Sequence, residues 1–193
     1  MGIDFNKSED FVNEFKIFND GNAGVVENVK VIVDKKAASD TSNHPNYKII
    51  ASDGKSEVNE GFYYQEPDSN AFNKYQAQRL IMLARGVLGD NVVFPPFNTP
   101  TEALDIVMTM IAPELLKQPW RVAVCYGTTK RKSPYLGFKS FGSFIQKMSE
   151  PNTLSLGAGD SLVRGALPEA ASTSELVSGV TGNPPNTDWL EDK

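Results

Sequence analysis

Two blocks of alternating apolar and polar residues, separated by a stretch of helical pattern, constrain the fold of this chain most strongly. The first block covers residues 25–64 and the second covers 120–141. Alternation with period two is typical of β-strands that bury one face, whereas residues 65–119 repeat apolar side chains every three to four positions. This order predicts a mainly β protein with a helical insert.

The first block predicts a three-stranded antiparallel meander. Strands are expected at 25–36, 47–52 and 58–64, with a polar loop over 37–46. The pair Asp53-Gly54 between the second and third strands is typical of a tight β-hairpin. On the first strand the valines point to the core and Lys30 points away from it.

The insert predicts two helices. The first is expected to start within 67–70 and to end near residue 88. Thr99 to Glu102 has the pattern of a capping box, with Pro100 at the first helical position, so the second helix is expected to start there and to end within 113–119. The apolar stripes of both helices are interpreted as core packing.

The second block predicts a β-hairpin. Strands are expected at 120–127 and 135–141, joined by a basic turn over 128–134, with a short helix at 141–148. From residue 151 the composition shifts to small and polar residues, which predicts a flexible acidic tail over 151–193. The expected folded domain is therefore 1–150, with an insert at about 65–119. Its N-terminal arm carries Phe5, Phe11, Phe15 and Phe18.

Three strands, two helices and two strands is the element order of an OB-fold, in which five antiparallel strands close into a small barrel. The first prediction is therefore a five-stranded OB-fold-like barrel. The alternative is an α+β sandwich, in which the helices cover one face of an open sheet.

Charge is distributed unevenly along the chain. The 193 residues hold 19 basic and 24 acidic side chains, a net charge of -5. The window 115–149 nevertheless has no acidic residue and seven basic ones, whereas 151–193 has six acidic and two basic residues. A basic stripe on the body favours a polyanionic partner; a solvated face and a solubilising tail are the alternative.

A resemblance to a known family follows from these segments. Residues 29–33, 46–50, 121–127 and 135–138, together with the acidic and hydrophobic tip, resemble phage single-stranded DNA-binding proteins that have one OB domain and an acidic C-terminal tail. The chain differs in its long helical insert and in ending on Lys193. The resemblance implies sequence-nonspecific binding and protection of single-stranded DNA in DNA replication or recombination. It also implies recruitment of replication proteins through the tip, Asp188, Trp189, Leu190, Glu191 and Asp192.

Single-strand binding needs cations along the phosphates and flat side chains that receive unstacked bases. Tyr135 and Lys139 are expected on one strand face, opposite Leu136 and Phe138. Ordinary core packing is the alternative for each aromatic residue, and a solvated turn is the alternative for residues 130–132. The candidate nucleic-acid-binding residues are Lys30, Lys48, Tyr63, Arg121, Lys130, Arg131, Lys132, Tyr135 and Lys139.

Several kinds of chemistry find no support in the sequence. One cysteine, Cys125, and one histidine, His44, make a disulfide framework or a two-histidine metal site impossible within the chain, and no phosphate-binding loop motif is present. We therefore expect no enzyme, no cofactor, no bound metal and no membrane span, and a location in the cytoplasm, or in the host cytoplasm for a viral protein.

The alternative function is a virion-structural or protein-interaction module that forms a homo-oligomer without nucleic acid. RNA binding is a third possibility.

Overall fold

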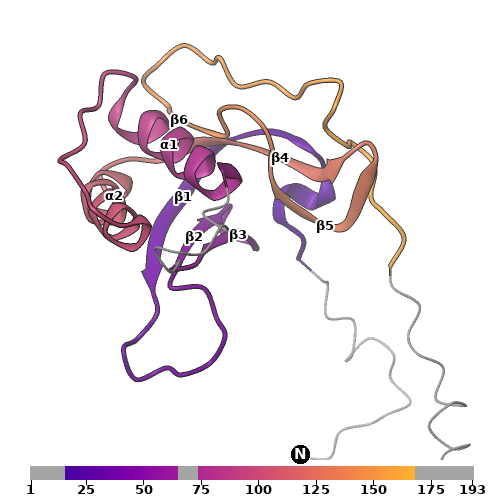
Figure 1. The fold of residues 1–193 in the computed structure, drawn as a ribbon. Coiled ribbons are helices and arrows are strands. Elements are labelled where there is room, and N and C mark those ends of the chain that lie inside the picture. Colours follow the sequence, from indigo (N-terminus) through magenta and orange to yellow (C-terminus); the bar gives the residue numbers. More distant parts are fainter. Residues whose placement is uncertain (1–15, 65–73, 168–193) are drawn as a thin grey trace, which may run out of the picture.

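The strands form where the sequence alternates, and the helices form in the insert between them. The structure is a computed structural model and describes residues 16–64 and 74–167. The sheet has six antiparallel strands, and two α-helices accompany it (Figure 1). The elements are β1 (Gly24–Lys35), β2 (Tyr47–Ser52), β3 (Glu57–Phe62), α1 (Lys74–Leu88), α2 (Pro100–Leu115), β4 (Trp120–Thr128), β5 (Arg131–Phe138) and β6 (Ile145–Lys147).

The predicted meander is confirmed. β2 pairs with β1 on one side and with β3 on the other, both antiparallel. The backbone N–H of Asp53 donates to the carbonyl of Ser56 in the hairpin predicted from Asp53-Gly54. Val29, Val31 and Ile49 are fully buried, because the period-two pattern turns them to the same face.

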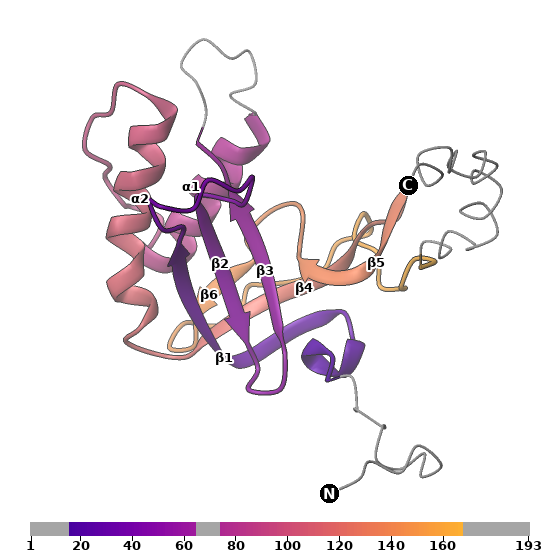
Figure 2. The same cartoon turned by 90° about the horizontal axis from the view of Figure 1, so that it is seen from below.

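β1 belongs to both halves of the sheet. Its first residues pair with β4 and its last residues pair with β2, so that the strand order is β3-β2-β1-β4-β5 (Figure 2). The register shifts between Val26 and Val29, where Asn28 adopts a φ of 58°. A bulge at this point bends the strand, and asparagine tolerates the left-handed conformation better than most residues.

The predicted closed barrel is not formed, because the sheet is open between β3 and β5. These two end strands approach each other, yet no strand ladder joins them in the described part of the chain. We call this gap the seam. At one end of the seam, the side chain of Arg79 on α1 forms hydrogen bonds to both sides of the gap.

Arg79 bridges the seam with its whole guanidinium group. Its Nε and Nη2 atoms donate to the two carboxylate oxygens of Glu60 on β3, and its Nη1 donates to the carbonyl of Lys139, just after β5, at 2.8 Å. The guanidinium carbon lies 3.8 Å from the centre of the Phe144 ring. Arg79 is only 2% exposed, so this ion pair is shielded from solvent.

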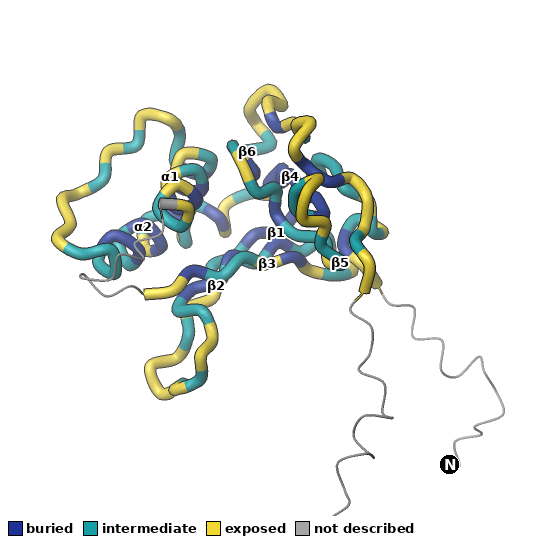
Figure 3. Tube along the Cα trace, turned by 45° about the vertical axis from the view of Figure 1, so that its right-hand side comes forward, coloured by how far each residue is buried: buried dark blue, intermediate teal, exposed yellow. Residues whose placement is uncertain are grey.

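The helices pack on the sheet and complete the core, as the colouring of Figure 3 shows. The predicted helix start at Thr99 is confirmed, since its hydroxyl accepts from the backbone N–H of Glu102 at 3.1 Å. The predicted start of the first helix, at 67–70, lies outside the described residues. α1 approaches β6 closely at Gly86, where a Cβ atom would lie 2.4 Å from the carbonyl oxygen of Ile145.

Two predictions about the C-terminal half are wrong. Residues 145–147 form strand β6 rather than a helix, because the edge of β4 at Trp120–Val122 offers backbone partners that a helix could not use. Residues 151–167 pack against the body, so the ordered domain extends beyond residue 150. Leu154 and Ser161 are buried, and Asp160 forms a β-bridge with Thr128. We call residues 150–167 the strap.

Candidate nucleic-acid interface

The tip of the β4–β5 hairpin carries three consecutive cationic side chains. Its turn is much shorter than the predicted 128–134, because Thr128 already pairs with Arg131. Gly127 makes this tightness possible: its φ is 82°, and a Cβ atom there would lie 2.6 Å from the carbonyl oxygen of Arg131. Lys130, Arg131 and Lys132 are all exposed, and no described carboxylate forms an ion pair with any of them.

A large bulge in β5 turns Tyr135 outward. Cys125 pairs with Gly137 and Gly127 pairs with Lys132, so residues 133–136 loop away from the ladder. Pro134 suits this segment, since it has no N–H to give to a strand partner. Tyr135 is 67% exposed, which makes its ring a flat surface beside the cationic tip.

An open groove occupies the seam at the end opposite Arg79. It lies between the start of β3 and the β5 bulge and has a volume of about 540 Å³. We call it the seam groove. Tyr135 lines it, together with the exposed cations Lys16 and Arg164 and the carboxylate of Glu57. The Nε of Arg164 donates to the carbonyl of Pro134 at 2.8 Å, which places this cation next to the Tyr135 backbone.

The predicted partnership of Tyr135 and Lys139 on one open face is not what the structure has. The strap covers Lys139, whose side chain is 13% exposed. Its ammonium group donates to the carbonyl of Ser155 and lies 3.9 Å from the carboxylate of Asp160. The bulge breaks the alternation that the sequence argument assumed, so only Tyr135 of this pair faces the open groove.

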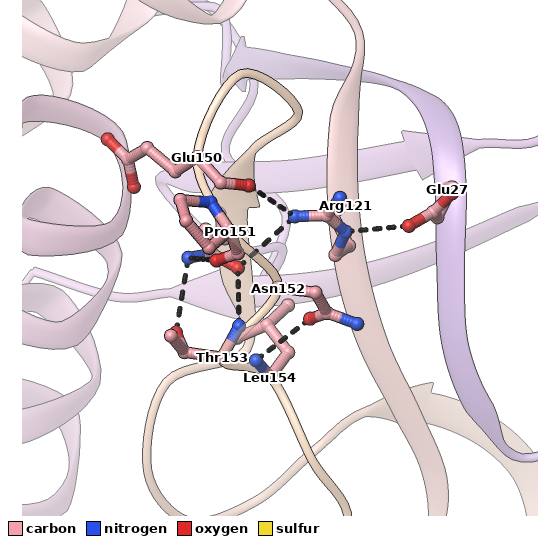
Figure 4. A network of polar contacts seen from close by, with 8 residues as sticks. Glu27, Arg121, Glu150, Pro151, Asn152, Thr153 and Leu154 are labelled. Atoms are coloured by element: carbon pink, nitrogen blue, oxygen red, sulfur yellow. Dashed lines mark hydrogen bonds and ion pairs between the residues drawn. The ribbon is translucent and has the colours of Figure 1, made fainter.

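Arg121 lies in the interior, at 6% exposure. Its Nε donates to Glu27 at 2.9 Å, and its Nη1 donates to the Glu150 carbonyl at 3.1 Å and to Gln146 at 3.4 Å (Figure 4). Gln146 in turn donates to the carbonyl of Pro151 at 2.9 Å. These contacts fix the start of the strap and hold Arg121 in the interior, so Arg121 is not part of the exposed cationic surface.

The remaining candidates lie on the outer face of the meander. Lys30 is exposed, Lys48 is half-buried opposite Gly61, and Tyr63 is 44% exposed. Tyr63 is held by Gln76 of α1, whose side-chain amide donates to the Tyr63 carbonyl at 2.7 Å. This group does not line the seam groove. The proposed partner-binding tip, Asp188 to Asp192, lies outside the described residues.

Sequence reasoning missed Lys16 and Arg164. Arg164 stands in a segment of small and polar residues that was interpreted as tail, and no local pattern distinguishes it from a solvated charge.

Of the aromatic residues in the second block, Trp120 and Tyr126 belong to the core, whereas Phe141 is exposed. The hydroxyl of Tyr126 donates to the carbonyl of Gly21 at 2.7 Å.

A second polar cluster surrounds Asp105 of α2. The hydroxyls of Tyr47 and Tyr64 both donate to its Oδ1 atom, the latter at 2.9 Å, and the ammonium group of Lys35 lies 3.7 Å away. Burial, followed by the hydrogen bond and the negative charge of Asp105, raises the pKa of each phenol to about 12. The cluster ties α2 to β2 and to the end of β3.

We expect these two tyrosines to make folding sensitive to strongly alkaline pH. An unfolded tyrosine titrates near pH 10, so the folded state resists phenolate formation between that value and about 12. The stabilisation is fully present below about pH 10 and is lost as the pH rises through the folded pKa. Phenolate absorbance should show at least two late-titrating tyrosines, since burial also raises the pKa of Tyr75. Asp105→Asn should lower the pKa of Tyr47 and of Tyr64, while burial keeps both above the ordinary value. Unchanged titration curves in Asp105→Asn would contradict this assignment.

Comparison with known proteins yields no match: no protein-family model, curated protein or solved structure is similar to this chain. Within residues 16–64 and 74–167, no group of three or more histidine, cysteine or acidic residues is arranged to hold a metal ion. No helix in the same ranges is long and apolar enough to cross a membrane. At the seam groove, the described surface offers the exposed Tyr135 ring, the cations Lys16 and Arg164, and the carboxylate of Glu57.

Proposed function

We propose that this protein binds single-stranded DNA without sequence preference and protects it during DNA replication or recombination, in a phage or another virus. One observation carries the proposal: the exposed Tyr135 ring lines a groove together with Lys16 and Arg164, and it follows closely on the cationic hairpin tip in β5. Cations follow phosphates, and an exposed ring receives an unstacked base of any identity. In a duplex the flat faces of the bases are stacked on one another and are not available to the ring. A stacking contact with Tyr135 therefore favours single strands.

The architecture supports the same proposal. We propose that the sheet is an OB-like barrel left open at the seam. The strand order β3-β2-β1-β4-β5, the bent β1 and the helical insert between β3 and β4 agree with the OB topology. In OB-folds the loop between the fourth and fifth strands contacts oligonucleotides, and here that loop is the Lys130 turn.

A protein-interaction module is the second candidate, because α1 and α2 expose an apolar groove that a nucleic acid would not need. The two candidates are separated by titrating the full chain into labelled single-stranded and double-stranded oligonucleotides of about 30 nucleotides, the length of several OB sites. Preferential binding of the single strand supports the proposal, and absence of binding at low salt contradicts it. Competition with an RNA of the same sequence decides between DNA and RNA.

Tyr135 provides the sharpest test of the site. We expect Tyr135→Ala to weaken single-strand binding by about 1–3 kcal/mol, or roughly 5- to 150-fold, because one base loses its stacking surface. Tyr135→Phe keeps the ring and should bind like the natural chain. Fluorescence anisotropy of labelled oligo-dT measures both. Equal affinity of the alanine and phenylalanine variants would remove Tyr135 from the interface.

A further inference from the structure

The two helices leave an apolar groove between them on the described surface. The cavity has a volume of about 420 Å³ and lies between α1, α2 and the connection that joins them. Leu80, Phe94, Leu104 and Val107 line it, and its only polar lining side chains are Gln76 and Arg85. We call it the helical groove. It shares no lining residue with the seam groove.

Large apolar side chains at this groove are exposed to water. Ile81 and Phe97 line it at 42% and 51% exposure, and Val93 beside it is 84% exposed. No described segment covers these three side chains. Contiguous exposed apolar surface of this kind marks interaction sites, and the cavity volume lies within the range of about 300–1,000 Å³ typical of ligand pockets.

The charged residues at the helical groove indicate what kind of segment can bind in it. Arg85 is the only charged lining residue, and it is exposed. The carboxylate of Glu102, near the start of α2, is turned toward the backbone N–H of Asn98 at 2.7 Å. The groove therefore fits an apolar anchor that is flanked by acidic residues, because its wall is apolar and its one charge is positive.

The chain itself carries such a segment. Trp189 and Leu190 are adjacent and are flanked by Asp188, Glu191 and Asp192. Tryptophan is among the residue types enriched at the energetically dominant positions of protein interfaces. The residues between Leu167 and Trp189 can extend over roughly 70 Å, whereas a body of this size has a diameter on the order of 40 Å. The segment is long enough to reach the helical groove.

We propose that Trp189 and Leu190 dock in the helical groove of the same chain, with the flanking acidic residues facing Arg85. Docking there removes Ile81 and Phe97 from water and leaves the seam groove open. The proposal stands independently of DNA binding, because the two grooves do not overlap.

The emission of Trp189 tests the proposal in the full chain. Subtracting the spectrum of Trp189→Phe from that of the natural chain isolates this emission from that of the buried Trp120. We expect the emission maximum of Trp189 to lie at a shorter wavelength than that of a solvent-exposed tryptophan. We also expect acrylamide to quench this emission only weakly. Ile81→Glu should shift the emission to longer wavelength and increase acrylamide quenching several-fold. The matched control is Leu116→Glu, an exposed apolar residue outside the helical groove, which should change neither.

A charge swap gives a second, independent measurement. Arg85→Glu should increase the quenching of Trp189, and Arg85→Glu combined with Glu191→Lys should restore its protection. The proposal is overturned if Trp189 of the natural chain is as accessible as free tryptophan, or if Ile81→Glu leaves it shielded. Shielding that grows with protein concentration would assign the groove to a second copy instead. Shielding that is lost in Tyr135→Ala but kept in Ile81→Glu would place the tip in the seam groove.

Discussion

The Arg79→Met variant should lose about 3–5 kcal/mol of its free energy of unfolding, because it leaves a mostly buried charge without its partner. The side chain of Glu60 is 18% exposed and would keep its carboxylate, while the carbonyl of Lys139 would lose its donor. A typical domain is stable by only about 5–15 kcal/mol, so this single change should remove a large share of its stability. Urea titration followed by the fluorescence of the buried Trp120 measures the loss.

Three companion variants separate the stability that comes from the Arg79 contacts across the seam from the effect of removing any positive charge. Arg131→Met, an exposed arginine of β5 outside both the seam contact and the helical groove, should change stability by less than about 0.5 kcal/mol. Arg79→Lys keeps the charge but cannot form the planar fork across the seam, so its loss should be intermediate. Arg79→Met with Glu60→Met should be more stable than Arg79→Met alone, since no charge is left unpaired. A loss in Arg79→Met no larger than that in Arg131→Met would mean that the seam is held by other contacts.

Replacing Lys130, Arg131 and Lys132 by alanine should weaken single-strand binding on the order of 100-fold at low salt, if each cation contributes about 1 kcal/mol or more through a charge-assisted contact. Each lost phosphate contact also removes counterion release. The slope of log K against log salt should therefore become shallower by about 2. Anisotropy titrations at a series of salt concentrations give both quantities. Folding should be unaffected, because all three side chains are exposed.

The matched control removes the same number of positive charges elsewhere. Arg85, Lys117 and Lys147 lie outside the hairpin and the seam groove. Their triple alanine variant should keep most of the affinity and nearly the full salt slope. Equal losses in the two triple variants would show that overall charge, rather than the hairpin tip, governs binding.

The local pattern of the sequence was sufficient for most elements. Alternation located β1, β2 and β3, because each buries one set of side chains against the core, and it also located β4, although β4 is buried on both faces. The capping box located the start of α2, since Thr99 satisfies a backbone N–H that every helix start leaves free. Residues 141–148 were misassigned because β6 exists only as a partner for β4, and a three-residue strand has too few positions to show a period.

The candidate site was harder to predict than the fold. Arg121 and Arg131 have the same side chain and both lie on hairpin strands, yet one is enclosed by the strap and the other is exposed. Tyr135 faces solvent because of a bulge, and the strap covers Lys139. The sequence contains no local signal for either, since both depend on segments that meet only after folding.

The sequence by itself determined most of the strands, the two α-helices of the insert and the cationic character of the second hairpin, because periodicity, caps and charge act over a few neighbouring residues. Only the tertiary structure decided where the sheet stays open, which cation bridges the seam and which cations face water. Those outcomes depend on contacts between residues far apart in the chain, such as Arg79 with Glu60 and Lys139 with Asp160. Folding brings each of these cations to its carboxylate in surroundings of low dielectric constant, where their attraction offsets the cost of burying the charges.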